Sequence, residues 1–188
     1  MTHGASNRSS TVWNIDLLKV VSYVLMESDF EKSVREFLAR PPFSLRGVTK
    51  EHLGLFCEAF THDSFSNEAL NMNPPRNIES YERLEFLGDS ILEFLVCEHI
   101  YSTTDLREGS MTDYKQDKVC NHMLSERILA KGIDLDSLIR VGGGHIGPGG
   151  SKRIEENMRA DCFEALLAAT YLSFGMDKAR LIVDELLL

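Results

Sequence analysis

The sequence predicts an all-α fold, and two observations support this prediction. Apolar residues recur three and four positions apart through most of the 188 residues, which is the spacing of one face of a helix. No stretch shows the sustained alternation of apolar and polar residues that marks a half-buried strand. With 43% hydrophobic and 26% charged residues, the chain has the composition of a globular protein and is long enough to bury its own core.

The N-terminal part of the chain is predicted to be a polar tail followed by two helices. Residues 1–12 are polar and rich in serine, so we expect a disordered tail ahead of a single domain that spans residues 13–188. Apolar residues at helical spacing predict helices over Ile15–Met26 and Phe30–Leu38. The prolines at positions 41 and 42 end this pair.

The middle of the chain is predicted to contain two helices separated by a loop. Thr49 is a favourable N-cap residue and is expected to open a helix that continues to Phe60. Ser66–Asn77 is rich in asparagine and contains two prolines, which favours a loop. Helical spacing then predicts a long helix over Ile78–Tyr101, followed by a second loop over Ser102–Gly109.

The last third of the chain is predicted to hold four helices around one irregular segment. A capping residue at Ser110 opens a helix through Met123, and Leu124–Lys131 is a further helical stretch. The glycines of Val141–Lys152 exclude regular structure there. The final two helices are expected over Glu155–Phe174 and Asp177–Leu187.

Four acids lie along one side of the long predicted helix. At about 100° per residue, their spacing places them within an arc of roughly 80°. These acids are Glu82, Glu85, Asp89 and Glu93. Like charges four residues apart destabilise an isolated helix by about 0.2–0.5 kcal/mol per pair. A row of mutually repelling carboxylates therefore requires an explanation.

A second acid pair occurs in the predicted helix Glu155–Phe174. Asp161 and Glu164 are three residues apart and share a helix face, which also carries the small residues Ala165 and Ala168. Small side chains let another helix approach closely. If the long acidic helix packs there, four carboxylates converge. They are Glu85, Asp89, Asp161 and Glu164.

A bound divalent cation would explain this convergence. Four adjacent carboxylates cannot all remain ionised without a counter-charge, and Mg²⁺ prefers oxygen ligands. The alternative is that the stripe is a solvated outer face. Against that alternative, Phe86 and Leu92 flank the stripe and the opposite arc is apolar, which favours a helix nearly surrounded by protein. This arc comprises Leu84, Leu87, Ile91, Phe94 and Leu95.

Charge, cysteines and targeting signals constrain the setting. The formal net charge of −9 opposes a nucleic-acid partner unless a cation reverses the local field. The four cysteines are far apart and form no CxxC pair, so we expect reduced core thiols. These are Cys57, Cys97, Cys120 and Cys162. Without a signal-peptide pattern or an apolar run of about 18 residues, we expect a cytoplasmic protein with no membrane partner.

The segment ERLEFLGDSIL, residues 82–92, closely resembles the signature of the ribonuclease III family of double-stranded-RNA endonucleases. Three further segments resemble family segments in the same order: CEAFTHDSFSNE at 57–68, REGSMT at 107–112 and ADCFEALLAATYLSFG at 160–175. The resemblance implies the helical fold of that family's endonuclease domain. The family's common form continues into a double-stranded-RNA-binding domain. This chain has no matching segment, so RNA would be held through the dimer groove alone or by a domain outside this chain.

The resemblance implies a Mg²⁺-dependent endoribonuclease, with Mn²⁺ as a substitute ion. It assigns the metal to Glu85, Asp89, Asp161 and Glu164, with Asp89 and Glu164 as catalytic residues. The metal would activate a water, leaving 5′-phosphate and 3′-hydroxyl ends. Two subunits of a homodimer would each cut one strand of the duplex. Phe86 matches an aromatic knob that enters the partner subunit, and Glu82 is placed at the same interface.

Candidate contacts to RNA are less specific. They are Arg107, Glu108, Lys115, Lys152 and Arg153, and plain surface charge is the alternative for each cation. Two other functions remain open: a non-catalytic relative that binds RNA or a partner protein, and a helical scaffold with solvated acids. All four acids are present, which favours catalysis. His62 is expected to cap a helix or to form a local hydrogen bond.

Overall fold

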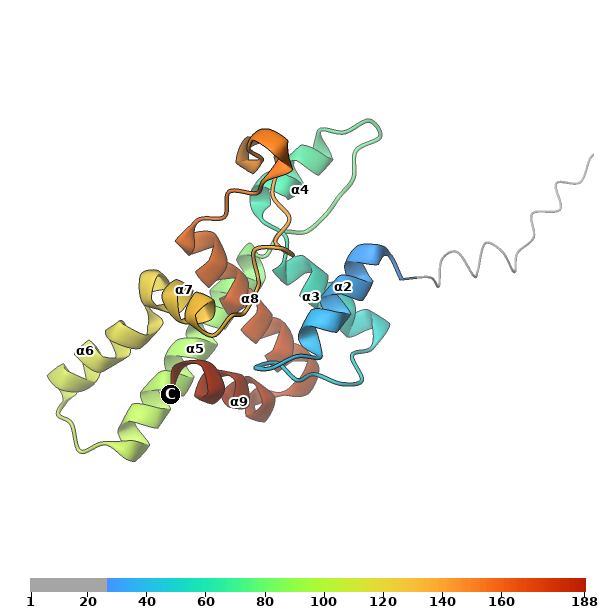
Figure 1. The fold of residues 1–188 in the computed structure, drawn as a ribbon. Helices are drawn as coiled ribbons and strands as arrows, with labels where there is room; N and C mark the ends of the chain where they lie inside the picture. The colour runs from blue at the N-terminus through green and yellow to red at the C-terminus, as the bar shows by residue number, and fades with distance from the viewer. Residues whose placement is uncertain (1–26) are drawn as a thin grey trace, which may run out of the picture.

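A computed structural model describes residues 27–188 of the chain, which form an assembly of α-helices (Figure 1). The helices are α2 Asp29–Leu38, α3 Lys50–Ala59, α4 Asp63–Leu70, α5 Glu82–Thr103, α6 Glu108–Val119, α7 Asn121–Ala130, α8 Glu156–Phe174 and α9 Met176–Leu187. Pairing of β type in this range is confined to two isolated bridges, Thr61–Arg140 and Ile146–Lys152. The all-α prediction is confirmed. The predicted tail 1–12 and helix Ile15–Met26 lie outside the described residues.

Helix α8 forms the centre of the fold. From Met158 to Thr170 every residue except Asp161 is buried, as expected for a helix that is apolar on nearly all sides. Helices α3, α5, α7 and α9 all contact α8, and α5 packs against it most extensively. In Figure 1, α8 passes through the middle of the molecule in front of α5. Residues carried by α8 are therefore held rigidly from several directions.

The contact between α5 and α8 depends on a glycine. A β-carbon at Gly88 would lie 1.9 Å from the main-chain oxygen of Glu164, so no larger residue fits without moving a helix. Ala165 and Ala168, the small residues predicted to allow a close approach, are fully buried. The approach itself is made possible at Gly88 of the partner helix, which the sequence reasoning did not consider.

One predicted loop is partly helical. Helix α4 occupies Asp63–Leu70, so the expected loop Ser66–Asn77 is wrong over its first five residues. The helix begins there because His62 acts as its N-cap, and its ring accepts a hydrogen bond from the Ser64 amide. The expected local role of His62 is confirmed.

Other helix boundaries also differ from the predictions. Helix α5 begins at Glu82 rather than Ile78. Helix α6 begins at Glu108 behind an extended N-cap, Arg107, so the predicted start at Ser110 is late. The break before α7 falls at Cys120, whose extended backbone interrupts the helical conformation.

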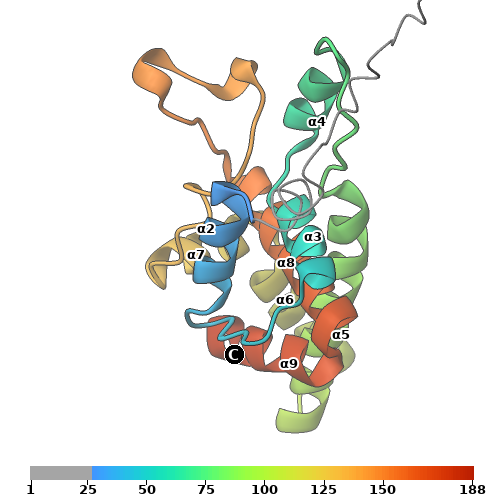
Figure 2. The ribbon, with the colours of Figure 1, turned by 90° about the vertical axis from the view of Figure 1, so that its right-hand side faces the viewer.

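The glycine-rich segment, Val141–Lys152, is fastened to α4. It forms two short 3-10 turns instead of a helix or strand. The amide of Gly142 donates to Ser64 Oγ (3.0 Å), and the amide of Gly143 donates to Glu68 Oε2 (2.7 Å). Figures 1 and 2 both show α4 and this segment projecting together from one end of the helical assembly.

Two further sequence predictions concern the cysteines and the membrane. All four cysteines are free thiols, but Cys97 is exposed, so the expectation of core thiols is wrong for that residue. It lines a shallow pocket between α5 and α6, together with Met111 and Lys115. Cys162 is buried, and the other two cysteines are half-buried. Within residues 27–188, no helix is both long and apolar enough to cross a membrane.

Candidate metal centre

Three carboxylates from two helices converge beside the contact between α5 and α8. They are Glu85 of α5 and Asp161 and Glu164 of α8, here called the acidic centre. One oxygen atom from each lies within 4.8 Å of the other two. Glu164 is 3% exposed, whereas Glu85 and Asp161 are half-buried. The centre is therefore partly enclosed and remains accessible on one side.

The acidic centre is electrostatically unfavourable without a cation. Burial, followed by the charges of Asp89, Asp161 and Glu85, raises the pKa of Glu164 to about 9. Burial and neighbouring carboxylates also raise the pKa of Glu85, and burial raises that of Asp161. Three oxygen donors that resist ionisation together form a donor set that fits a hard divalent cation.

Asp89 adjoins this group without belonging to it. It lies one helical turn after Glu85, is half-buried, and is the carboxylate that contributes most to the raised pKa of Glu164. Burial and Glu93 raise the pKa of Asp89, whereas Lys115 lowers it. The structure thus brings three of the four predicted ligands together and places the fourth beside them.

The two remaining acids of the stripe have different environments. Glu93 forms an ion pair with Lys115 of α6, with 2.9 Å between the carboxylate oxygen and the ammonium nitrogen. Glu82, at the first position of α5, is exposed. The stripe is consequently not one uniform surface, because its middle faces α8 while its ends are paired or solvated.

Two residues that the sequence analysis missed lie near Asp161. Tyr81 is buried, and burial together with the nearby charge of Asp161 raises the pKa of its hydroxyl. The amide of Asn121, at the start of α7, donates to Asp161 Oδ1 at 3.4 Å. Tyr81 directly precedes the signature helix and could have been noticed there. Nothing in the sequence pattern points to Asn121.

Comparison with known proteins assigns this chain to a family. A family model described as Ribonuclease-III-like matches residues 53–188, a range that contains the whole acidic centre. The chain belongs to the ribonuclease-III-like family. The resemblance found in the sequence is confirmed.

Individual relatives agree with this assignment. Ribonuclease 3 of Caldanaerobacter subterraneus subsp. tengcongensis is 40% identical over 133 residues, which cover 70% of this chain and 54% of the relative. Ribonuclease 3 of Onion yellows phytoplasma is 36% identical over 149 residues, covering 78% and 57% of the two chains. This ribonuclease-III-like chain therefore spans about half the length of the curated relatives it matches.

A solved structure supports the fold. The nuclease domain of ribonuclease III from Campylobacter jejuni superimposes with a TM-score of 0.61 and 23% sequence identity. The match covers 84% of this chain and 92% of that domain. The ribonuclease-III-like helical fold predicted from the sequence is thus confirmed.

The side chains predicted to contact RNA in this ribonuclease-III-like chain differ in whether they are free to bind a ligand. Arg107, Glu108 and Arg153 are exposed. The Lys152 ammonium instead donates to the main-chain oxygens of Ser137 (2.7 Å) and Ile139 (2.8 Å), which gives it a structural role. The ammonium of Lys115 is occupied by Glu93, as described above. Two of the four predicted cations thus have partners within the chain.

An apolar row lies exposed on α5. Phe86 is 76% exposed, as expected for a ring that a single subunit leaves uncovered. Phe94 is 52% exposed, so its expected place on a covered apolar arc is wrong. Tyr101 lies about two turns after Phe94 on the same helix face and is 78% exposed. Helix α5 therefore keeps part of its surface uncovered, although α8, α6 and α9 all contact it.

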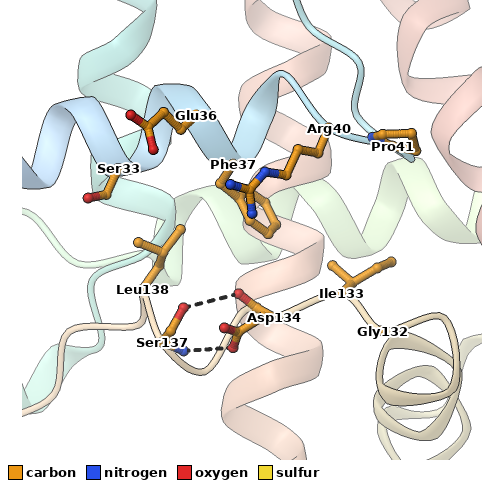
Figure 3. A pocket seen from close by; sticks show the side chains of 10 residues that line it. All are labelled: Ser33, Glu36, Phe37, Arg40, Pro41, Gly132, Ile133, Asp134, Ser137 and Leu138. Carbon is orange, nitrogen blue, oxygen red and sulfur yellow. Dashed lines mark hydrogen bonds between the residues drawn. The ribbon is translucent and has the colours of Figure 1, made fainter.

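A cavity of the described residues lies elsewhere. Its volume is about 390 Å³, and it separates α2 from the turn that follows α7 (Figure 3). Glu36, Arg40 and Asp134 supply its charged side chains. None of the predicted site residues lines it. The predicted site residues of this ribonuclease-III-like chain therefore lie at the acidic centre and around it, away from this cavity.

Proposed function

We propose that this chain is a metal-dependent endoribonuclease that hydrolyses double-stranded RNA. The observation that carries the proposal is the acidic centre, in which Glu85, Asp161 and Glu164 present oxygens within 4.8 Å of one another. Burial and the neighbouring acids raise the pKa of Glu164, so a cation that favours the ionised carboxylates fits the site. Membership of the ribonuclease-III-like family supports the same conclusion. Mg²⁺ is the proposed ion, and Mn²⁺ would substitute for it.

Each residue of the site has a distinct role. Glu85, Asp161 and Glu164 bind the ion, and Asp89 completes the ligand set from the adjoining turn of α5. Asp89 and Glu164 are the proposed catalytic residues. When bound, the ion supplies an activated water and stabilises the leaving 3′ oxygen, which gives 5′-phosphate and 3′-hydroxyl ends. The rigid burial of α8 keeps Asp161 and Glu164 fixed while substrate arrives.

The active species is proposed to be a homodimer. Exposed apolar rows are unusual on monomers, and Phe86, Phe94 and Tyr101 form such a row on α5. A two-fold axis beside α5 would let each Phe86 enter the other subunit, with Glu82 at the edge of the interface. The Campylobacter jejuni nuclease domain has a region involved in dimer formation, which supports this arrangement. Two acidic centres would then face the two strands of one duplex.

RNA contacts are proposed at exposed cations. Arg107 at the start of α6 and Arg153 after the glycine-rich segment bind phosphates, with Glu108 beside the first of them. Lys115 neutralises Glu93 and reduces the repulsion between the acids and the RNA backbone. Lys152 acts by holding the preceding turn. With a net charge of −9, binding is expected to rely on these few cations and to weaken as the salt concentration rises.

Cleavage of a long RNA duplex with Mg²⁺ tests the proposal. The native chain is compared with Glu164→Gln and Asp89→Asn, and with Glu51→Gln as a control at an exposed glutamate of α3. We expect short duplex products from the native chain and the control. The two site variants should lose cleavage by at least about 100-fold and still bind the duplex in a gel-shift assay.

Two other outcomes would contradict the proposal. Equal cleavage by the site variants would remove the acidic centre from the reaction. Binding without cleavage by the native chain, at low salt with ample Mg²⁺ and Mn²⁺, would indicate a binding module instead of an enzyme.

A further inference from the structure

We infer that Asn121 is a positioning residue of the acidic centre, where its side-chain amide holds the Asp161 carboxylate in place for the metal. This inference rests on the proposed metal-binding function. Asn121 is not one of the acids that define the centre, and it acts through one of them.

The side-chain nitrogen of Asn121 lies between two oxygen acceptors on α8. It donates to Asp161 Oδ1 and to Asn157 Oδ1, at 3.4 Å in each case. Asn157 and Asp161 are four residues apart and therefore share one face of α8. Because an amide nitrogen carries two N–H groups, one donor is available for each acceptor. The two contacts together orient the Asn121 amide with its nitrogen toward α8.

The start of α7 is held against α8. Asn121 is the first residue of α7, and Leu124, one turn later, is fully buried. The hydroxyl of Ser125 accepts a hydrogen bond from the guanidinium of Arg159 on α8 (2.7 Å), and both of these side chains are buried. Arg159 lies two residues before Asp161 in the same helix. The donor on α7 and the carboxylate on α8 therefore keep their relative positions.

Asp161 is held less by packing than its neighbour in the acidic centre. Glu164 is 3% exposed, whereas Asp161 is the half-buried residue in the otherwise buried stretch of α8. A half-buried carboxylate can rotate toward water unless a donor holds it. Hydrogen-bond donors to ligating carboxylates maintain the geometry that a metal requires. Because the Asn121 amide is uncharged, it orients the carboxylate without neutralising it, and the negative charge remains available to the cation.

Metal binding by Asn121→Ala tests this role without relying on cleavage. Binding of Mn²⁺ alone is measured by electron paramagnetic resonance and by calorimetry. We expect the dissociation constant for Mn²⁺ to rise about 10-fold, because the metal ligand loses its orienting partner. The midpoint of urea unfolding, measured with a chelator, should stay nearly the same, since alanine is favourable in a helix. A residue that acted only by stabilising the fold would change the midpoint instead.

Asn157→Ala is the matched control. It removes the exposed second acceptor of the same amide and leaves the contact with Asp161 in place. We expect its affinity for Mn²⁺ to remain within about 2-fold of native. Equal losses in the two variants would show that Asn121 acts by joining α7 to α8, and would overturn the inference. So would native affinity in Asn121→Ala. Failure of the native chain itself to bind Mn²⁺ would instead refute the proposed function, on which this inference depends.

Discussion

A β-carbon placed on Gly88 would lie 1.9 Å from the main-chain oxygen of Glu164, so α5 and α8 touch backbone to backbone beside the acidic centre. We predict that Gly88→Ala pushes the two helices apart. Overpacking of this kind costs about 1–3 kcal/mol of unfolding free energy. It should also weaken Mn²⁺ binding, because Glu85 lies on one helix and its partners on the other.

Gly54→Ala is the matched control for this prediction. Gly54 lies inside α3, where an added β-carbon meets no atom within 4 Å. Alanine in a helix interior is favoured over glycine by about 0.5–1 kcal/mol, so this variant should be more stable than native. Urea unfolding of both variants checks the pair of predictions. A stabilised Gly88→Ala would show that the helices are not in such close contact.

A second prediction concerns pH. The pKa of Glu164 is about 9 in the folded chain and has an ordinary value of 4.5. Between these values the folded state binds the extra proton, so stability without metal should fall as pH rises from about 4.5 to about 9. If the folded state binds one proton more than the unfolded state, the free energy of unfolding falls by about 1.4 kcal/mol per pH unit.

The slope is measured by urea unfolding with a chelator at pH 5, 7 and 9. Glu164→Gln should remove most of the pH dependence in this window and should be more stable than native at pH 8. Glu85 and Asp161 shift in the same direction, so the quantity that tests Glu164 is the difference between the two chains. Parallel curves for native and Glu164→Gln would contradict the prediction.

A third prediction is that metal binding releases a proton. A cation at the acidic centre favours ionised Glu164, so at pH 7.5 binding should expel close to one proton from this residue. Calorimetry of Mg²⁺ binding in two buffers with different ionisation enthalpies measures the number. At 100 times the dissociation constant, Mg²⁺ should also raise stability by about 2.7 kcal/mol. Glu164→Gln should show neither effect at that concentration, whereas Glu51→Gln should show both.

A fourth prediction concerns association of subunits. Phe86 is 76% exposed, so Phe86→Asp should leave the melting of the isolated subunit nearly unchanged. Sedimentation velocity should show a dimer for the native chain and a monomer for this variant. Leu181→Asp is the control, since Leu181 is 57% exposed on α9. Monomer formation by both variants, or by neither, would exclude the α5 face as the interface.

Helical periodicity was sufficient to find the acids but not their supporting residues. Spacing alone places Glu85 and Asp89 on one face and Asp161 with Glu164 on another, because a helix repeats every 3.6 residues. Gly88 was missed because a glycine inside a helix is usually noted for its low helix propensity. That it allows a close helix–helix contact becomes visible only in the structure. Tyr81 was missed because a tyrosine beside a helix is usually core, and its nearness to Asp161 depends on the tertiary fold.

Other differences also arise from tertiary contacts. The asparagine-rich composition of Ser66–Asn77 predicted a loop, but its first residues belong to helix α4, for which His62 is the N-cap. Lys152 looked like a free cation, but its ammonium binds main-chain oxygens that lie 13 and 15 residues earlier. No local pattern reports such contacts. The sequence therefore predicts the reactive groups better than the groups that hold them.

The burial of Glu164 has an evolutionary consequence. A buried acid that opposes folding is retained only while selection requires what it does. In a lineage without that requirement, replacing Glu164 by a neutral residue would immediately increase the stability of the folded protein. Ribonuclease-III-like chains that lose activity should therefore lose this position early and keep their architecture afterwards, which makes an intact Glu164 a sensitive marker of a working member.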